Sequence, residues 1–521
     1  MKRSFFFSVL FIIIVYRPWF AFNRALSGGD WPYVYRQSAE SFPLLAGKGY
    51  LWLDTYFNIA AKFGMQYFGL SWELTEKIFW FFPFLLIVLV SSWYFLNEVF
   101  LSERRDIRAV LCGIGSIVYS TNSYILMIAG GGQMGVAMGY ALAPAVIGAL
   151  RRRSSVVSVG LSALQLMFDP RLFIITIIGY TGIEVIYSSV GHGQLKRSAT
   201  LLLIVVFFTV LLNAFWIVPN FFDYRGMYEG ATQGDTLSYF SFATFSNSLA
   251  LLHPNWPENI FGKVGFMRPE YIFVAVVAYS GIALLRKGRH GALIAAFAAI
   301  ALAGAFLSKG VQDPAGSIYR FLAKIPGFMV FRDPTKFYLL TALSYSVLIP
   351  YSVSNVFRKI WPVTAILFLF FWSVLSFPAL RGDLGGTFAP KLVPASYTRL
   401  YDWLVARRNA SHILWIPKHQ RFGYATLTQK AISSQDEIAD VSPNEFADIL
   451  NSAEGKKMIT ERGIGLFIIP ADSEKEIFLT DRSYDDAKRK AWISAIDTVN
   501  WVEKITIPGV ADSITVYNVV Y

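Results

Sequence analysis

The apolar residues of this 521-residue chain are gathered into eleven long stretches, which polar connections separate. A helix built from such a stretch can cross the ~30 Å hydrocarbon core of a bilayer. The predicted spans are residues 4–22, 78–98, 109–128, 134–150, 155–168, 171–188, 198–219, 270–286, 291–307, 336–355 and 361–379. The pattern therefore predicts a polytopic α-helical membrane protein. The stretches 155–168 and 171–188 are short, and a re-entrant pair of half-helices is an alternative for them.

The connections between these stretches alternate in charge. The segments "MKR", "ERRDIR", "RRR", "LKR", "RKGRH" and "FRK" together carry 15 Lys and Arg, and the opposite connections are longer and poorer in basic residues. The positive-inside rule then places the N-terminus in the cytoplasm, and an odd number of spans places the C-terminus outside. The first stretch lacks a following small-x-small cleavage site, which predicts a retained signal-anchor helix in the plasma membrane.

This topology places the long segments on one face. The chain divides into a transmembrane domain, residues 1–380, with large external loops at 23–77, 220–269 and 308–335, and an extracytoplasmic domain, residues 381–521. In the second domain the pattern changes to helices at "SYTRLYDWLVARR", "SPNEFADILNSAEGKKMITE" and "YDDAKRKAWISAI", and strands at "HILWIP", "GIGLFIIP", "VEKITIP" and "SITVYNVVY". We predict a small α/β domain, with binding or support as its role.

Composition agrees with a membrane protein. Hydrophobic residues make up 55% of the chain and charged residues only 16%, and the mean hydropathy is +0.45. The net charge is +12, yet residues 380–521 hold 17 basic and 18 acidic residues, so the surplus lies in the membrane half. This distribution indicates contact with anionic membrane lipid and does not imply nucleic acid. The single cysteine, Cys112, excludes an intramolecular disulfide.

Two polar clusters at span ends are the strongest candidates for chemistry. Asp30 in "SGGDWPY" follows the first span, where it is either a turn or capping residue or a general base able to take a proton from a hydroxyl. "FRDPTKF" places Arg332, Asp333 and Lys336 at the start of another span. These residues suit a phosphate at headgroup depth, and interfacial snorkelling with an Arg–Asp pair is the alternative.

Further candidates stand at other membrane entries. They are Asp169 and Arg171 in "FDPR", Asp223 and Arg225 in "LNAFWIVPNFFDYRG", His253 in the 220–269 loop, and Arg17 within the first span. Aromatic belts and paired charges explain most of them without a function. Arg17 is harder to explain in this way, because an ionisable residue at such depth usually faces a cavity or a partner.

In order along the chain, "SGGDWPY", "GGGQMGVAMGYALAP", "FDPR", "LNAFWIVPNF" and "FRDPTKF" resemble the pattern of the GT-C superfamily of integral-membrane glycosyltransferases. The branch that they resemble contains the bacterial cell-wall arabinofuranosyltransferases and related multi-spanning proteins of teichoic-acid glycosylation. The resemblance covers most of residues 1–380. This chain lacks the long carbohydrate-binding extension of the larger members, which leaves its acceptor open.

The resemblance implies a function and a set of roles. A polyprenyl-phosphate-linked sugar would be the donor, and an extracytoplasmic glycan, lipid or protein would be the acceptor. Asp30 would be the catalytic base of an inverting displacement. Arg332, Lys336 and Arg17 would bind the donor phosphate, with Asp333, Asp169, Arg171, Asp223, Arg225 and His253 as further substrate-site candidates.

Two other classes of protein fit the same pattern. A lipid-linked substrate transporter would also be polytopic, although no internal repeat supports it. A non-catalytic scaffold of envelope assembly would keep the fold and tolerate loss of Asp30. Residues 381–521 contain no metal-ligand spacing, and the sugar, the acceptor and any need for a divalent cation stay open.

Overall fold

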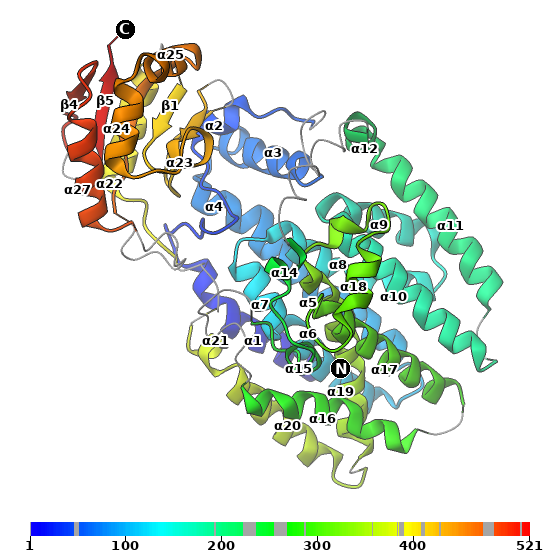
Figure 1. The fold of residues 1–521 in the computed structure, drawn as a ribbon. Helices are drawn as coiled ribbons and strands as arrows, with labels where there is room; N and C mark the ends of the chain where they lie inside the picture. Colours follow the sequence, from blue (N-terminus) through cyan, green and yellow to red (C-terminus); the bar gives the residue numbers. More distant parts are fainter. Residues whose placement is uncertain are drawn as a thin grey trace. The chain divides into compact units, whose positions relative to one another are not determined.

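The computed structural model describes residues 2–45, 52–191, 194–221, 236–254, 268–285, 288–356, 358–382, 384, 390–407, 412–426, 429–472, 484–510 and 513–520. The chain forms two compact units. The first contains residues 1–20, 45–57 and 80–386, and the second contains residues 21–44, 58–79 and 387–521. Figure 1 labels the elements of both.

The first unit is a helical bundle. Its helices are α1 (Lys2–Tyr16), α5 (Phe82–Val99), α6 (Arg105–Thr121), α7 (Ser123–Gly130), α8 (Met134–Arg151), α9 (Ser155–Phe168), α10 (Pro170–Ser189), α11 (Leu195–Leu212), α12 (Ala214–Phe221), α14 (Thr236–Phe240), α15 (Phe245–Leu249), α16 (Ile272–Ser280), α17 (Arg289–Ser308), α18 (Gly316–Leu322), α19 (Tyr338–Asn355), α20 (Trp361–Leu375) and α21 (Phe377–Arg381). Short 3-10 turns η1 (Arg17–Phe20), η5 (Pro269–Tyr271), η6 (Gly281–Leu284), η7 (Phe328–Phe331) and η8 (Pro334–Phe337) join them.

Six helices of the described chain are long and apolar enough to cross a membrane. They are Trp72–Val99, Met134–Arg151, Pro170–Ser189, Leu195–Leu212, Arg289–Ser308 and Pro334–Asn355. The pair α6 and α7, bent by 42°, makes a seventh if it is one span. Shorter apolar helices cover Ser4–Phe20, Ser155–Phe168, Pro269–Leu284 and Trp361–Leu375. Each predicted span thus coincides with an apolar helix or helix pair, while the count of eleven remains a prediction.

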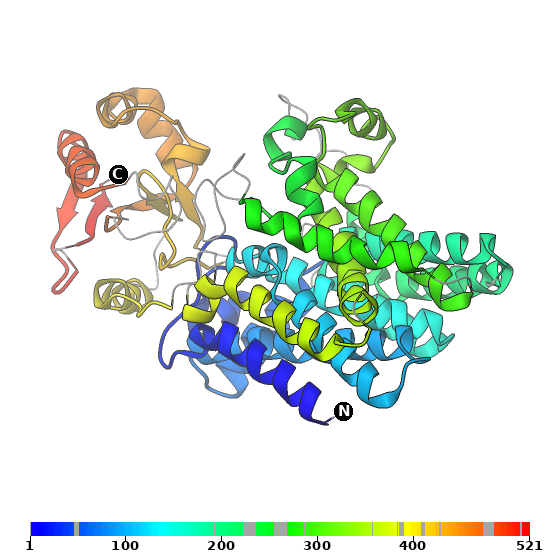
Figure 2. The same ribbon diagram turned by 90° about the horizontal axis from the view of Figure 1, so that it is seen from below.

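Burial separates the centre of this bundle from its outside. The apolar window of α19 is completely buried and that of α8 is 94% buried, so these two helices form the core. Helix α11 is only 17% buried and lies at the edge of the bundle in both views (Figures 1 and 2). Its exposed side chains include Leu203, Phe207 and Leu211. A large exposed apolar surface of this kind is unfavourable in water. The bundle is therefore that of an integral membrane protein.

The second unit is built on a five-stranded sheet with the order β2-β1-β3-β5-β4. Its strands are β1 (His412–Trp415), β2 (Ala431–Ser433), β3 (Ile464–Ile469), β4 (Val502–Ile505) and β5 (Thr515–Val519). Strand β1 pairs in parallel with β2 and β3, and β5 pairs antiparallel with β3 and β4. The predicted strands coincide with β1, β3, β4 and β5. Strand β2 was missed, since three residues are too few to show an alternating pattern.

Helices cover both faces of this sheet. The helices of the unit are α2 (Arg36–Ser41), α4 (Trp72–Glu76), α22 (Ala395–Ala406), α23 (Ser434–Glu437), α24 (Pro443–Asn451), α25 (Ala453–Glu461) and α27 (Asp486–Ile496), and α3 (Asp54–Lys62) crosses the boundary between the units. Helices α24, α25 and α27 pack on one face through Phe446, Ile459 and Trp492. Helix α22 covers the other face together with Ala25 and Tyr35 of the segment 21–44.

Candidate functional site

The "FRDPTKF" cluster folds into a capped turn that leads into the buried helix α19. The side chain of Asp333 accepts hydrogen bonds from the amide of Thr335 at 3.1 Å and from its hydroxyl at 2.5 Å. Pro334 follows at the first helical position, where its missing N–H costs nothing. Asp333 therefore acts as an N-cap, and this cap fixes the direction in which Lys336 leaves the turn.

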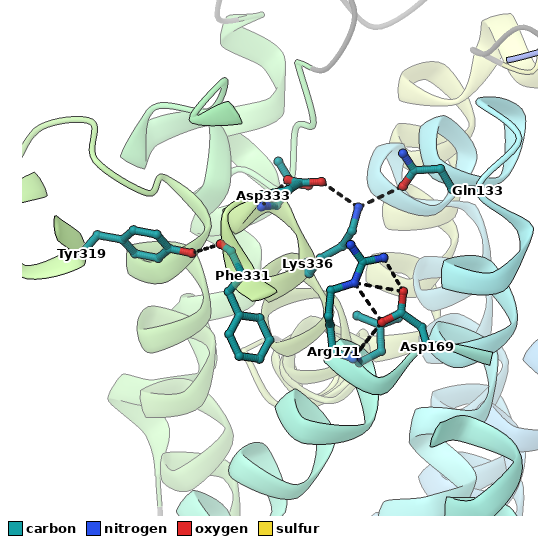
Figure 3. Close-up of polar contacts among 9 residues, drawn as sticks. Gln133, Asp169, Arg171, Tyr319, Phe331, Asp333 and Lys336 are labelled. Atoms are coloured by element: carbon teal, nitrogen blue, oxygen red, sulfur yellow. Dashed lines mark hydrogen bonds and ion pairs between the residues drawn. The ribbon is translucent and has the colours of Figure 1, made fainter. Parts of the chain in front are cut away.

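Lys336 is the centre of the cluster. Its side chain is 1% exposed, and its ammonium group donates to Oδ2 of Asp333 at 2.8 Å and to Oε1 of Gln133 at 2.9 Å (Figure 3). Gln133 lies 203 residues away, directly before α8. Sequence reasoning missed Gln133, although a lone polar residue between "GGG" and an apolar helix was a usable signal.

Asp169 and Arg171 form a second ion pair in the same unit. Asp169 caps the start of α10 by accepting from the amides of Arg171 and Leu172 at 2.9 and 3.2 Å. The Arg171 guanidinium donates to both carboxylate oxygens, with Nε at 3.1 Å from Oδ1 and Nη2 at 2.5 Å from Oδ2. The Asp169 side chain is 1% exposed, so the pair is held rigidly in a low-dielectric setting.

Two glycines of "GGGQMGVAMGYALAP" let this turn lie on α8. A Cβ added to Gly139 would stand 3.3 Å from Cβ of Asp169, and one added to Gly135 would stand 2.9 Å from the carbonyl oxygen of Phe168. The spacing of these glycines is that of a small-residue helix contact in membranes. The motifs at 130–144 and 168–171, separate in the sequence, thus form one packed element.

The electrostatics of Asp333 link the two ion pairs. Burial alone would raise the pKa of this carboxyl, but the Lys336 ammonium, the hydrogen bonds from Lys336 and Thr335, and the charge of Arg171 lower the pKa to about 2. Asp333 is therefore ionised at neutral pH. Because Asp333 and Asp169 balance Lys336 and Arg171, these four side chains carry no net charge.

His253 lies beside this cluster and is uncharged. Burial lowers the pKa of its imidazole to about 3, while Asp333 and Lys336 act on it in opposite directions. Its ring stands 5.3 Å from that of Tyr124 and 5.2 Å from that of Tyr338. The Tyr124 hydroxyl is buried and has no hydrogen-bond partner within the described part of the chain.

The other basic candidates are placed differently. Arg332 is exposed and lies 5.6 Å from the centre of the Phe240 ring. Arg17 donates to the carbonyl oxygens of Leu380 and Arg381 at 2.7 and 2.9 Å, so it caps the end of α21. The cluster around Lys336 does not include Arg17. Asp223 and Arg225 lie outside the described residues.

Asp30 belongs to the second unit, at the tip of a tight turn. The amide of Gly28 donates to the carbonyl of Trp31 at 2.8 Å, and the reverse bond is 3.1 Å long. Gly29 has a φ of 61°, which the first central position of a type II′ turn requires and glycine adopts without strain. The side chain of Asp30 is exposed beyond this turn.

The buried side chain of Glu76 supports this turn. Glu76, at the end of α4, accepts from the amide of Leu26 at 2.6 Å and from Nε1 of Trp31 at 3.1 Å. Trp72 stacks against Trp31 with ring centres 6.0 Å apart. The sequence analysis missed Glu76. Its position directly before the apolar stretch 78–98 could have indicated a functional or structural role. The turn that carries Asp30 is thus supported by Glu76 and Trp72 of α4.

Metal ligands are not gathered in the part of the chain that the structure describes. No group of three or more His, Cys, Asp and Glu side chains that could hold a metal ion occurs there.

The fold is similar to the folds of two solved glycosyltransferases, which confirms a GT-C-like fold, as the sequence resemblance predicted. The structure resembles arabinofuranosyltransferase AftD from Mycobacteria with a TM-score of 0.54 at 13% identity, covering 100% of this chain and 40% of AftD. It also resembles the apo oligosaccharyltransferase of Archaeoglobus fulgidus with a TM-score of 0.53 at 11% identity, covering 91% of this chain and 69% of that one.

The chain therefore spans less than half the length of AftD. No protein-family model and no curated protein sequence matches it.

Proposed function

We propose that this protein is a membrane glycosyltransferase that moves a sugar from a polyprenyl-phosphate donor to an extracytoplasmic glycan, lipid or protein. The GT-C-like fold supports the class of reaction. In this proposal the N-terminus is cytoplasmic, and residues 381–521 form a domain on the outer side. The membrane-embedded donor and the soluble acceptor would then meet at the outer membrane surface.

The observation that carries the proposal is the buried ammonium group of Lys336 at the entry of α19. Lysine has three N–H donors, and two of them have acceptors among the described residues, Asp333 and Gln133. The third N–H is left for an oxygen of the donor phosphate. The N-terminus of a helix adds positive potential there, and Arg332 adds a positive charge in the same unit.

The reaction would be a single displacement with inversion. Asp30 takes the proton of the acceptor hydroxyl while that oxygen attacks the anomeric carbon. The bond from the anomeric carbon to the phosphate oxygen breaks, and polyprenyl phosphate leaves with the electron pair. Lys336 and Arg332 stabilise the negative charge that grows on the leaving phosphate.

The test uses the full chain in lipid vesicles with a panel of polyprenyl-phosphate sugars and glycan acceptors. We expect transfer by the wild type, and loss of roughly 1.5–3 kcal/mol of donor stabilisation in Lys336→Met and in Arg332→Ala. Lys309→Met is the matched control, because the Lys309 ammonium is also buried but donates to the carbonyl of Gln312.

The possible outcomes distinguish a donor-binding lysine from a structural lysine, and an enzyme from a non-catalytic scaffold. If Lys336→Met and Lys309→Met lost donor stabilisation equally, the loss would reflect an effect on folding, and Lys336 would have no specific role in donor binding. Absence of transfer by a folded wild type with every donor would contradict the enzyme and favour the non-catalytic scaffold.

A further inference from the structure

The turn that carries Asp30 is built into the C-terminal part of the second unit. The backbone of Ala25 pairs with that of Lys391 through hydrogen bonds of 2.8 and 2.9 Å. The hydroxyl of Tyr35 donates to the carbonyl of Phe422 at 2.8 Å. The Tyr35 ring also stacks on that of Tyr401 at 4.4 Å. The first external loop is therefore held by the sheet domain at several points.

One contact of this kind reaches the turn itself. A Cβ added to Gly28 would lie 1.8 Å from Nη2 of Arg421 and 2.7 Å from its Cζ, so the guanidinium group lies directly against the backbone of Gly28. Gly28 is the residue whose amide and carbonyl close the turn around Asp30 through Trp31. A side chain at position 28 would displace Arg421.

The turn is thus held at two places. Glu76 accepts hydrogen bonds from Leu26 and Trp31. Arg421, which is half-buried and follows β1 in the segment 416–425, contacts the turn at Gly28. A lysine ammonium differs from the guanidinium in shape and would not reproduce this contact equally well. The side chain of Asp30 itself remains exposed.

We propose that Arg421 is a positioning residue for Asp30. It fixes the turn at Gly28 so that the carboxylate keeps one place relative to the acceptor hydroxyl. This inference rests on the proposed function, in which Asp30 is the base. It assigns the C-terminal domain a part in the chemical step, beyond support or binding. A general base works only within hydrogen-bond reach of the proton that it takes, and a displacement of about 1 Å can cost ~10²-fold in rate.

The structural arm of the test is hydrogen exchange measured on the full chain in detergent. The amides of Leu26, Gly28 and Trp31 are hydrogen-bonded and should exchange slowly. Arg421→Ala should speed exchange in the peptide that contains them by about tenfold. Arg399→Ala is the matched control, because Arg399 rests on Gly509 in the same unit at 1.6 Å from an added Cβ. This control should leave the peptide unchanged.

The kinetic arm separates positioning from folding. Arg421→Ala should lower kcat about tenfold with little change in KM for the donor, Arg421→Lys should restore only part of the rate, and Gly28→Ala should reproduce the loss of kcat by displacing Arg421. If hydrogen exchange were unchanged in Arg421→Ala, the contact between Arg421 and Gly28 would not stabilise the turn. If exchange were faster but kcat unchanged, the positioning role of Arg421 would be refuted. An inactive wild type would refute the proposed function, and with it the positioning role, whatever the exchange arm shows.

Discussion

The Lys336 ammonium lies 2.8 Å from Oδ2 of Asp333, and the lysine side chain is 1% exposed. The two residues stand three positions apart in one capped turn. The same ammonium group also contacts Gln133, from the start of α8. A charge buried in this way is stable only while its partners are in place. This pair therefore controls the packing of the turn at the start of α19.

Breaking the pair should destabilise the protein, and removing both charges should not. We expect Asp333→Asn to lower the free energy of unfolding by about 3 kcal/mol, because it leaves the Lys336 charge buried beside Gln133 alone. Lys336→Met in the same background should recover most of that loss. Thermal unfolding in detergent measures both variants. A double variant as unstable as Asp333→Asn would contradict this account.

Acid should destabilise the protein through His253. The folded-state pKa of about 3 lies below the ordinary value of 6.5, so the neutral imidazole stabilises the fold above pH 6.5, and this stability is lost as the pH falls towards 3. Between pH 7 and pH 5 the loss is about 2 kcal/mol. Asp333 adds a similar loss only below about pH 4, because its folded pKa of about 2 is also depressed.

Unfolding midpoints at pH 7 and pH 5 test this expectation. The variant His253→Asn should show a smaller difference between the two midpoints than the wild type. His412→Asn serves as a control, since that ring is partly exposed at the start of β1. Identical pH dependence in the wild type and His253→Asn would exclude a role for His253.

The variant Asp30→Asn should show whether Asp30 acts as a general base or only as a turn residue. Asparagine keeps the size of the side chain and suits turns, so folding and the exchange of the Gly28 amide should be unchanged. If Asp30 takes the proton, the rate of sugar transfer should fall by ~10² to 10⁴. The assay is transfer from a polyprenyl-phosphate sugar to a glycan by the purified variant. Near-normal turnover would refute the catalytic assignment.

The contact between α8 and the α9–α10 turn should depend on Gly139. Gly139→Leu forces a side chain against Asp169, whose Cβ is 3.3 Å from an added Cβ, and should cost about 1–3 kcal/mol of stability. Gly160→Leu is the control, because no atom lies within 4 Å of an added Cβ in α9. Equal melting temperatures of the two variants would contradict the close approach.

The orientation in the membrane can be read with a fused reporter. The basic connections on one side predict a cytoplasmic N-terminus and an extracytoplasmic C-terminus. A reporter joined after Tyr521 should be active only in the extracytoplasmic compartment, and one joined after Arg153 should be active only in the cytoplasm. The reverse pattern would overturn the predicted topology.

The sequence by itself determined the features that depend on local pattern. Membrane helices need long apolar runs whatever their neighbours are, so α8, α17 and α19 could be placed from residue type alone. A cap is also local, and Asp333 before a proline indicated the start of a helix. The short apolar run in "GIGLFIIP", bounded by Gly463 and Pro470, indicated β3 for the same reason. The GT-C resemblance depended on the order of such local motifs.

Only the tertiary structure decided which of these elements meet. Gln133 contacts Lys336 across 203 residues, Glu76 holds Leu26 across 50, and Arg421 rests on Gly28. Periodicity carries no information on such pairs, because it reports which face of a helix is apolar and not which side chain faces it. Close packing and the need to pair each buried charge select these partners. For this reason Arg17, a phosphate-binding candidate by sequence, lies at a helix end, while Gln133 and Glu76 became visible only in the fold.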